Sequence, residues 1–259
     1  MFKDVIGDWP TYHRFILCSC DEIYLNKYFP RFYKTFTEHW SLPIHVHVVD
    51  PSAQSLERLS ALEISHTHCE TQGHHWLASA EKLRASNPNY QHDTIEHMRQ
   101  AMYECYCQAQ RFIVMGHNLQ AQQHVIVADV DAYALRRPTE REHDRLFNDM
   151  AFTTFNRRLM ATFCHFHPNR KEQCLTAASL MTTMVMDSRT LGVDQKVLKQ
   201  VFGSLPYTEL TNGEWIRHFD VKTQNDMKEH NQCLIYHEKG TRGKLKTVET
   251  TWTDIEKQR

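Results

Sequence analysis

The sequence predicts an α/β protein with a mostly parallel central sheet flanked by helices. Short apolar runs rich in β-branched residues alternate with longer amphipathic segments, which is the pattern of strands connected by helices. The run at residues 124–128 (HVIVA) is apolar throughout, as expected for a strand covered on both faces. The 259 residues are 41% hydrophobic and 24% charged and contain no repeat, so we expect a single compact domain.

The N-terminal part of the chain contains three predicted strands. The first spans residues 14–20 (RFILCSC) and leads into a helical segment over residues 22–39. The second spans residues 44–49 (IHVHVV), and a short helix over residues 54–62 leads to a third strand near residues 64–67. Consecutive strand–helix units of this kind favour parallel strands.

A polar stretch separates these units from the middle of the chain. Residues 69–89 include Gly73 and the breaker sequence at residues 87–89 (NPN), so we expect a mobile excursion there. A long helix over residues 93–120 then leads directly into the apolar strand at residues 124–128.

The second half of the chain is less regular. Residues 150–155 (MAFTTF) and 159–166 (LMATFCHF) predict strands. Residues 172–186 combine helix-forming residues with a Thr-rich middle, so their periodicity fits either a strand or a helix. Residues 194–202 predict a helix with Asp194 at its start, where a carboxylate caps free N–H groups.

Two aspartates, Asp129 and Asp131, follow the apolar strand at residues 124–128. In α/β sheets, ligands bind beyond the carboxyl ends of the strands, and alternation along an extended chain directs both carboxylates to one side. Two hard oxygen ligands suit Mg²⁺ or Mn²⁺ carrying a substrate diphosphate. A D-x-D sequence by itself is also common in solvated turns and helix caps, and the preceding buried strand is what favours a metal site here.

Composition restricts the partners and the compartment. Thirty basic and thirty-one acidic residues give a net charge of −1, so no global field attracts nucleic acid or an anionic membrane. No stretch approaches the roughly 20 apolar residues of a transmembrane segment. The first ten residues, MFKDVIGDWP, lack the apolar core of a signal peptide. We therefore expect a cytoplasmic protein without nucleic-acid partners.

The cysteines and histidines do not form a recognisable zinc motif. The eight cysteines include two C-x-C pairs but no C-x-x-C, and the eighteen histidines show no H-E-x-x-H spacing. In a reducing compartment, this pattern favours free thiols over disulfides or a zinc site.

Several chemistry-bearing residues occur in an order that resembles a known family. They are Asp21 and Tyr24 after the first strand, Arg111 ahead of VIVADVDAYALRRP, the pair Asp194-Gln195, and His237 in the late segment HEKG. This order is similar to that of GT-A fold glycosyltransferases of the glycogenin and bacterial lipopolysaccharide-glycosyltransferase type. The resemblance implies one Rossmann-like GT-A domain over residues 1–259. Residues 1–131 are expected to form a nucleotide-binding half and residues 132–245 an acceptor-side half. Residues 246–259 are expected to form a polar tail that frays.

The resemblance also implies a metal and phosphate site. In this family the D-x-D aspartates and a late histidine, here Asp129, Asp131 and His237, hold a divalent ion, Mn²⁺ or Mg²⁺, on the diphosphate of a nucleotide sugar. His237 and Gly240 keep the H-x-x-G spacing of the family's H-F-x-G-x-x-K-P-W motif, whereas its aromatic residue and its Pro-Trp are absent and its lysine is displaced by one position to Lys244. The residues expected at the phosphates are Lys239, Gly240 and Lys244. Glycines permit close backbone approach and lysines supply charge, although such a segment also fits a basic surface turn.

Further residues are expected at the donor and the acceptor. Asp21 and Tyr24 correspond to the base and ribose site, with Tyr24 as a stacking face or, alternatively, as a core residue. Arg111 corresponds to a basic residue that contacts the donor, and its alternative is an ordinary ion-paired helix residue. Asp194 could bind sugar hydroxyls, and either Asp194 or Asp187 could act as a general base in an inverting reaction.

The function expected from this resemblance is metal-dependent transfer of a hexose from a nucleotide diphosphate sugar, with a UDP-sugar favoured, to a saccharide or another hydroxyl acceptor. Three alternatives stay open. A phosphatase of the haloacid-dehalogenase type also carries D-x-D after an apolar strand, with one aspartate as nucleophile. A nucleotidyltransferase shares the fold, but the Gly-rich loop it uses is missing from residues 18–27 (CSCDEIYLNK). A non-catalytic binding protein on the same fold is the third.

Overall fold

The computed structural model describes residues 5–71, 74–87, 91–155, 158–186, 192–211, 214–218, 233–237 and 250–257. The strands are β1 (Arg14–Asp21), β2 (Ile44–Val49), β3 (Ser65–Cys69), β4 (His124–Ala128), β5 (Ala132–Ala134), β6 (Ala151–Phe155), β7 (Arg158–Phe166), β8 (Thr208–Thr211), β9 (Ile216–His218) and β10 (Ile235–His237). The helices are α1 (Glu22–Lys27), α2 (Phe29–His39), α3 (Ala53–Ala61), α4 (His74–Ser86), α5 (Ile95–Asn118), α6 (Glu140–Phe147), α7 (Lys171–Met186), α8 (Val193–Phe202) and α10 (Trp252–Glu256), with a 3₁₀ turn η2 (Pro168–Arg170).

Among these residues, seven strands form one sheet in the order β3-β2-β1-β4-β7-β6-β8, and three short strands form a second sheet in the order β5-β10-β9. In the large sheet β7 runs antiparallel to its neighbours β4 and β6, whereas the other neighbouring pairs are parallel. The predicted α/β class with a mostly parallel central sheet is confirmed.

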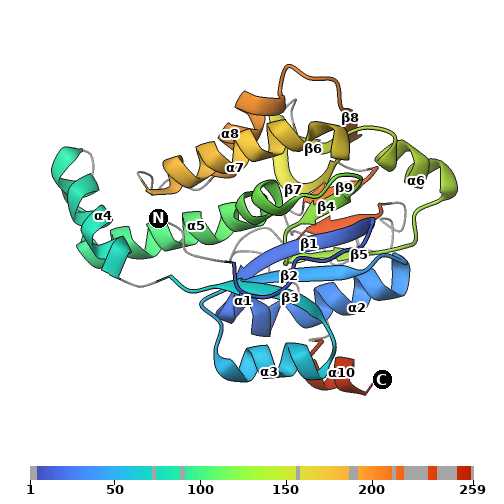
Figure 1. The fold of residues 1–259 in the computed structure, drawn as a ribbon, viewed down its shortest axis with the longest axis horizontal. Helices are drawn as coiled ribbons and strands as arrows, with labels where there is room; N and C mark the ends of the chain where they lie inside the picture. The colour runs from blue at the N-terminus through green and yellow to red at the C-terminus, as the bar shows by residue number, and fades with distance from the viewer. Residues whose placement is uncertain are drawn as a thin grey trace.

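Helices cover both faces of the large sheet (Figure 1). Helices α5, α7 and α8 lie on one face, and α1, α2, α3 and α10 lie on the other. Alternate residues of β1 supply the two cores: Phe15 packs with the first group of helices, whereas Ile16 packs with the second. Both side chains are fully buried. A strand buried on both faces requires the continuous apolar sequence from which it was predicted.

Most predicted strands are observed near their expected bounds, and the apolar runs at 14–20, 44–49 and 124–128 form β1, β2 and β4. The segment at 172–186, which fitted either state, is helical and belongs to α7. The helix expected over 22–39 is divided in two at Tyr28, because Pro30 has no N–H to continue the hydrogen bonds of α1 and suits the first turn of a new helix instead.

One helix was not predicted, and two local expectations were wrong. The polar stretch at 69–89 contains helix α4, which packs against α5 and extends with it beyond the edge of the sheet (Figure 1). Asp194 is not the cap of α8, because the helix begins one residue earlier after Gly192, whose φ of 89° suits glycine. The polar tail contains the short helix α10, whose Trp252 is buried and donates from Nε1 to Asn26 Oδ1 at 3.1 Å.

All eight cysteines lie within the described ranges and are free thiols, as expected. Within the same ranges, no helix combines the length and the hydropathy needed to cross a bilayer.

Candidate functional site

Asp129 and Asp131 lie beyond the carboxyl end of β4, in a tight turn that leads into β5. The backbone N–H of Asp129 donates to the carbonyl of Thr162 on β7 at 2.9 Å, and its carbonyl accepts from the N–H of Ala132 at 3.0 Å. These two bonds fix the backbone on both sides of the aspartates. The turn therefore holds both carboxylates at the edge of the sheet.

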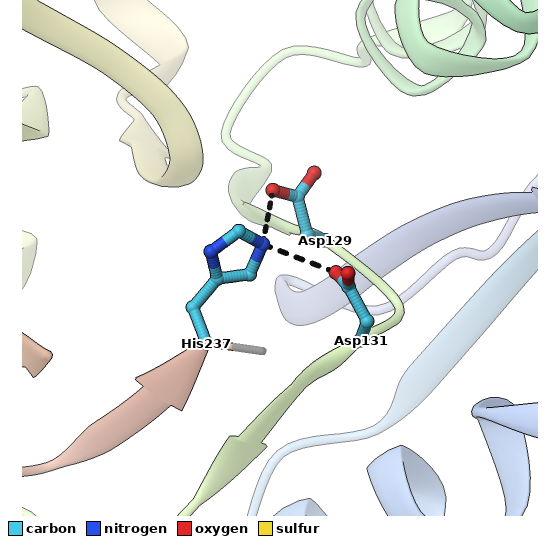
Figure 2. A group of neighbouring side chains, drawn as sticks. All are labelled: Asp129, Asp131 and His237. Carbon is cyan, nitrogen blue, oxygen red and sulfur yellow. Dashed lines mark ion pairs between the residues drawn. The ribbon is translucent and has the colours of Figure 1, made fainter. Parts of the chain in front are cut away.

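His237 reaches the same place from the end of β10. This strand pairs antiparallel with β5, and the register places His237 opposite Ala132. As Figure 2 shows, the imidazole points between the two carboxylates, with Nε2 at 3.1 Å from Asp129 Oδ2 and 3.1 Å from Asp131 Oδ1. One ligand atom from each residue lies within 4.8 Å of the others, so the three could hold a metal ion.

The charge of the two aspartates dominates the environment of His237. Burial by itself lowers the pKa of this imidazole, but the negative charge of Asp131 and hydrogen bonds to both carboxylates outweigh it and raise the pKa to about 10. This raised pKa favours the protonated imidazole at neutral pH when no metal is bound. A metal ion bound there would replace that proton, because a ligating imidazole must be neutral.

Arg111 connects the metal-ligand group to a third aspartate. This residue of α5 is buried, and its Nη2 lies 2.7 Å from Asp129 Oδ1 and 3.0 Å from Asp194 Oδ2. The guanidinium also donates to the carbonyl oxygens of Gln108 at 2.7 Å and Ala161 at 3.3 Å. Burial lowers the pKa of Arg111, but Asp129 and Asp194 outweigh it and hold that pKa above its ordinary value. The side chain is thus an internal bridge between two carboxylates.

Asp194 lies in the first turn of α8 with its carboxylate buried. Oδ1 accepts from the N–H of Gln195 at 2.7 Å, and Oδ2 faces Arg111. Burial raises the pKa of Asp194, while the positive charge of Arg111 opposes that rise. The bridge through Arg111 places Asp194 beside the metal-ligand group.

Asp21 and Tyr24 lie at the carboxyl end of β1. Asp21 caps α1, since its Oδ1 accepts from the N–H of Tyr24 at 2.8 Å. Burial raises the pKa of Asp21, and this hydrogen bond partly offsets the rise. Tyr24 is 45% exposed, and the centroid of its ring lies 4.9 Å from that of Tyr28. Tyr24 is therefore a surface residue with an accessible aromatic ring, and not a core residue.

Four predicted residues, Asp187, Lys239, Gly240 and Lys244, lie outside the described residues. The structure thus brings together Asp129, Asp131, His237, Arg111 and Asp194, and places Asp21 and Tyr24 at the end of a neighbouring strand. Sequence reasoning missed the carbonyl oxygens of Gln108 and Ala161, which hold Arg111. Every residue has a carbonyl, so no residue type could have signalled these two.

Comparisons with known proteins identify the fold. No family model matches the chain, and no curated protein matches its sequence. Among solved structures, the galactosyltransferase LgtC, determined with donor and acceptor sugar analogues, superposes with a TM-score of 0.54 over 95% of each chain at 12% identity.

Two further glycosyltransferases are similar. The glycosyltransferase GlyE of Streptococcus pneumoniae TIGR4 matches 93% of this chain with a TM-score of 0.54 at 12% identity. The bifunctional glycosyltransferase WbbM matches 97% with a TM-score of 0.51 at 14% identity. The chain spans 60% of the GlyE chain and 50% of the WbbM chain. The protein therefore has a GT-A-type glycosyltransferase fold.

Proposed function

We propose that this protein is a metal-dependent glycosyltransferase that moves a hexose from a nucleotide diphosphate sugar, with a UDP-sugar favoured, to a saccharide or another hydroxyl acceptor. The observation that carries the proposal is the convergence of Asp129, Asp131 and His237 at the carboxyl edge of a GT-A-type sheet. Two carboxylates and an imidazole drawn from two distant segments form a ligand set that neither segment could supply alone.

The donor atoms of this group fit a divalent metal. Carboxylate oxygens suit Mg²⁺ and Mn²⁺, and imidazole nitrogen is a common ligand of transition metals, so the mixed set favours Mn²⁺. When bound, the metal would neutralise the diphosphate that leaves as the glycosidic bond breaks. Lys239 and Lys244, close to His237 in the sequence, are proposed to contribute positive charge to the same phosphates, with Gly240 allowing close approach.

The bridge formed by Arg111 supports a role in aligning the site. Because Arg111 contacts Asp129 and Asp194 together, it fixes a metal ligand relative to a carboxylate proposed to face the donor sugar. Asp194 would bind sugar hydroxyls, and either Asp194 or Asp187 would accept the acceptor proton in an inverting reaction. The accessible ring of Tyr24 and the carboxylate of Asp21 are proposed to contact the base and the ribose. In this proposal residues 1–131 bind the nucleotide and 132–245 face the acceptor.

Ligand-dependent thermal stability tests the proposal. The melting temperature of the wild type and of Asp131→Asn would be measured with UDP, GDP, CMP and their sugars, with and without Mn²⁺. Because a ligand that binds the native state stabilises it by mass action, we expect a Mn²⁺-dependent rise with one nucleotide in the wild type only. If the melting temperatures of the two proteins rose equally, Asp131 would not be a ligand of the metal.

The products distinguish the remaining alternatives. A glycosyltransferase releases a nucleoside diphosphate from a nucleotide sugar, whereas a nucleotidyltransferase releases pyrophosphate from a nucleoside triphosphate. A binding protein would show the thermal shift without either product. The GT-A-type fold gives no support to the phosphatase alternative, for which hydrolysis of phosphate monoesters is the direct assay.

A further inference from the structure

We propose that Arg31 of α2 is a positioning residue for the metal site, acting through strand β5 on His237. The inference rests on the proposed metal site and extends it to a residue that is not one of the three proposed ligands. It predicts that a change on α2 alters metal affinity.

Helix α2 holds β5 at two points. The Cζ atom of Arg31 lies 3.5 Å from the centroid of the Tyr133 ring, a close cation–π contact. The backbone N–H of Ala134 donates to the hydroxyl of Thr35 at 3.2 Å. Arg31 and Thr35 are four residues apart and therefore lie on one face of the helix. The two contacts fix both the position and the direction of the strand.

Strand β5 in turn positions two of the three metal ligands. Asp131 directly precedes the strand, and His237 is the register partner of its first residue, Ala132. In the same register Tyr133 pairs with Tyr236, and the centroids of their rings are 4.6 Å apart. The contacts therefore run from Arg31 to the ring of Tyr133, to the ring of Tyr236, and then along the chain to His237.

The small sheet needs such support because its strands are short. β5 and β10 have three residues each. Strand β5 lies at the edge of this three-stranded sheet, and so small a sheet gains stability when it packs against a helix. A stacked guanidinium resists rotation of the tyrosine ring, whereas a lysine ammonium at this position would supply charge without a planar surface.

The affinity for Mn²⁺ tests the inference directly. Free Mn²⁺ would be measured by electron paramagnetic resonance during titration of the wild type, Arg31→Gln, Arg31→Lys and Thr35→Ala. The matched control is Arg14→Gln, since Arg14 also stacks on an aromatic ring, with Cζ at 4.6 Å from the centroid of Phe147, but at the opposite end of β1 from the site.

We expect about a tenfold loss of Mn²⁺ affinity in Arg31→Gln, a size typical of residues that orient metal ligands, and a smaller loss in Arg31→Lys and Thr35→Ala. Arg14→Gln should bind Mn²⁺ like the wild type. The melting temperatures of Arg31→Gln and Arg14→Gln would also be compared without metal. If they are similar, a loss of Mn²⁺ affinity in Arg31→Gln reflects the site and not general destabilisation.

The outcomes separate this inference from the proposed function. If the wild type does not bind Mn²⁺, the proposed metal site fails and the inference fails with it. If the wild type binds and both Arg31→Gln and Thr35→Ala bind equally well, the metal site stands and the role of Arg31 is overturned. If Arg31→Gln does not fold, the Mn²⁺ affinities of Arg31→Lys and Thr35→Ala are compared with that of the wild type instead. Unchanged affinity in both would overturn the role of Arg31.

Discussion

The guanidinium of Arg111 lies 3.0 Å from the carboxylate of Asp194, although 83 positions separate the two residues in the sequence. Both side chains are buried, and the same Nη2 atom contacts Asp129 at 2.7 Å. Charges removed from water are costly unless they are paired and hydrogen-bonded. The bridge therefore satisfies a requirement of stability while it aligns the edge of the proposed metal site.

Replacing Arg111 by Met should destabilise the protein strongly. The change leaves Asp129 and Asp194 near each other without the cation, and breaking a buried pair on one side typically costs about 3–5 kcal/mol. Urea unfolding at pH 7 measures the loss. The double variant Arg111→Met/Asp194→Leu is the control, and should recover part of the stability because it removes a carboxylate left unpaired. A loss below about 1 kcal/mol in the single variant would contradict a buried bridge.

Binding of Mn²⁺ should release a proton from His237. The pKa of about 10 lies above the ordinary value of 6.5, so the proton contributes stability to the metal-free fold below pH 6.5, and this contribution is lost as the pH rises through about 10. Between these values the metal competes with the proton, and its affinity should rise up to about tenfold per pH unit.

Calorimetry in two buffers that differ in ionisation enthalpy counts the released protons, and we expect a value near one at pH 8. In Asp131→Asn the charge that contributes most to raising the pKa of His237 is gone. Any residual binding in that variant should therefore release less than one proton. Metal binding without proton release in the wild type would exclude His237 as a ligand.

The sequence predicts those parts of the site that depend on local patterns. Asp129 and Asp131 follow a buried strand, and an apolar run that ends in two carboxylates can be recognised within eight residues. The large sheet is predictable for the same reason, since strands buried on both faces need continuous apolar runs.

His237 could be assigned only through the family resemblance. Its position depends on the pairing of β10 with β5, and three-residue strands show too little periodicity to be recognised. The bridge from Arg111 to Asp194 depends on the packing of α5 against α8, which has no signature in either segment. Helix α4 was missed because its polar sequence has almost no amphipathic pattern.

Gly116 lies where α5 approaches α7 closely. A Cβ atom at this position would lie 2.4 Å from the carbonyl oxygen of Cys174 and 2.6 Å from Cβ of Ala178, both on α7. Backbone atoms cannot yield as a flexible side chain can, so the helices would have to separate.

Gly116→Ala should therefore lower the free energy of unfolding by about 1–3 kcal/mol, although alanine favours helix more than glycine does. Urea unfolding measures the change. Ser179→Ala, on the exposed face of α7, is the control and should stay within about 0.5 kcal/mol of the wild type. A stabilising effect of Gly116→Ala would mean that the helices are not in contact there.

Glu142 anchors the segment between β5 and α6. Its carboxylate accepts two hydrogen bonds from Arg136, at 2.7 and 2.9 Å, and one from the N–H of Thr139 at 2.8 Å, which completes a capping box. The hydrogen bonds from Arg136 lower the pKa of Glu142 from 4.5 to about 2, with a smaller contribution from Thr139.

A carboxyl group with a depressed pKa stabilises the fold above its unfolded pKa, and the contribution is lost as the pH falls from 4.5 towards about 2. Glu142→Gln should thus lower the free energy of unfolding at pH 7 by about 1 kcal/mol, and the difference from the wild type should shrink as the pH approaches 2. Glu140→Gln, an exposed change in the same helical turn, is the control and should have little effect. Urea unfolding at pH 7 and pH 3 measures both variants. If Glu142→Gln differed from the wild type by the same amount at pH 7 and pH 3, the charge of Glu142 would not be what stabilises the segment. A contribution from the ionised carboxylate must shrink as the carboxylate is protonated.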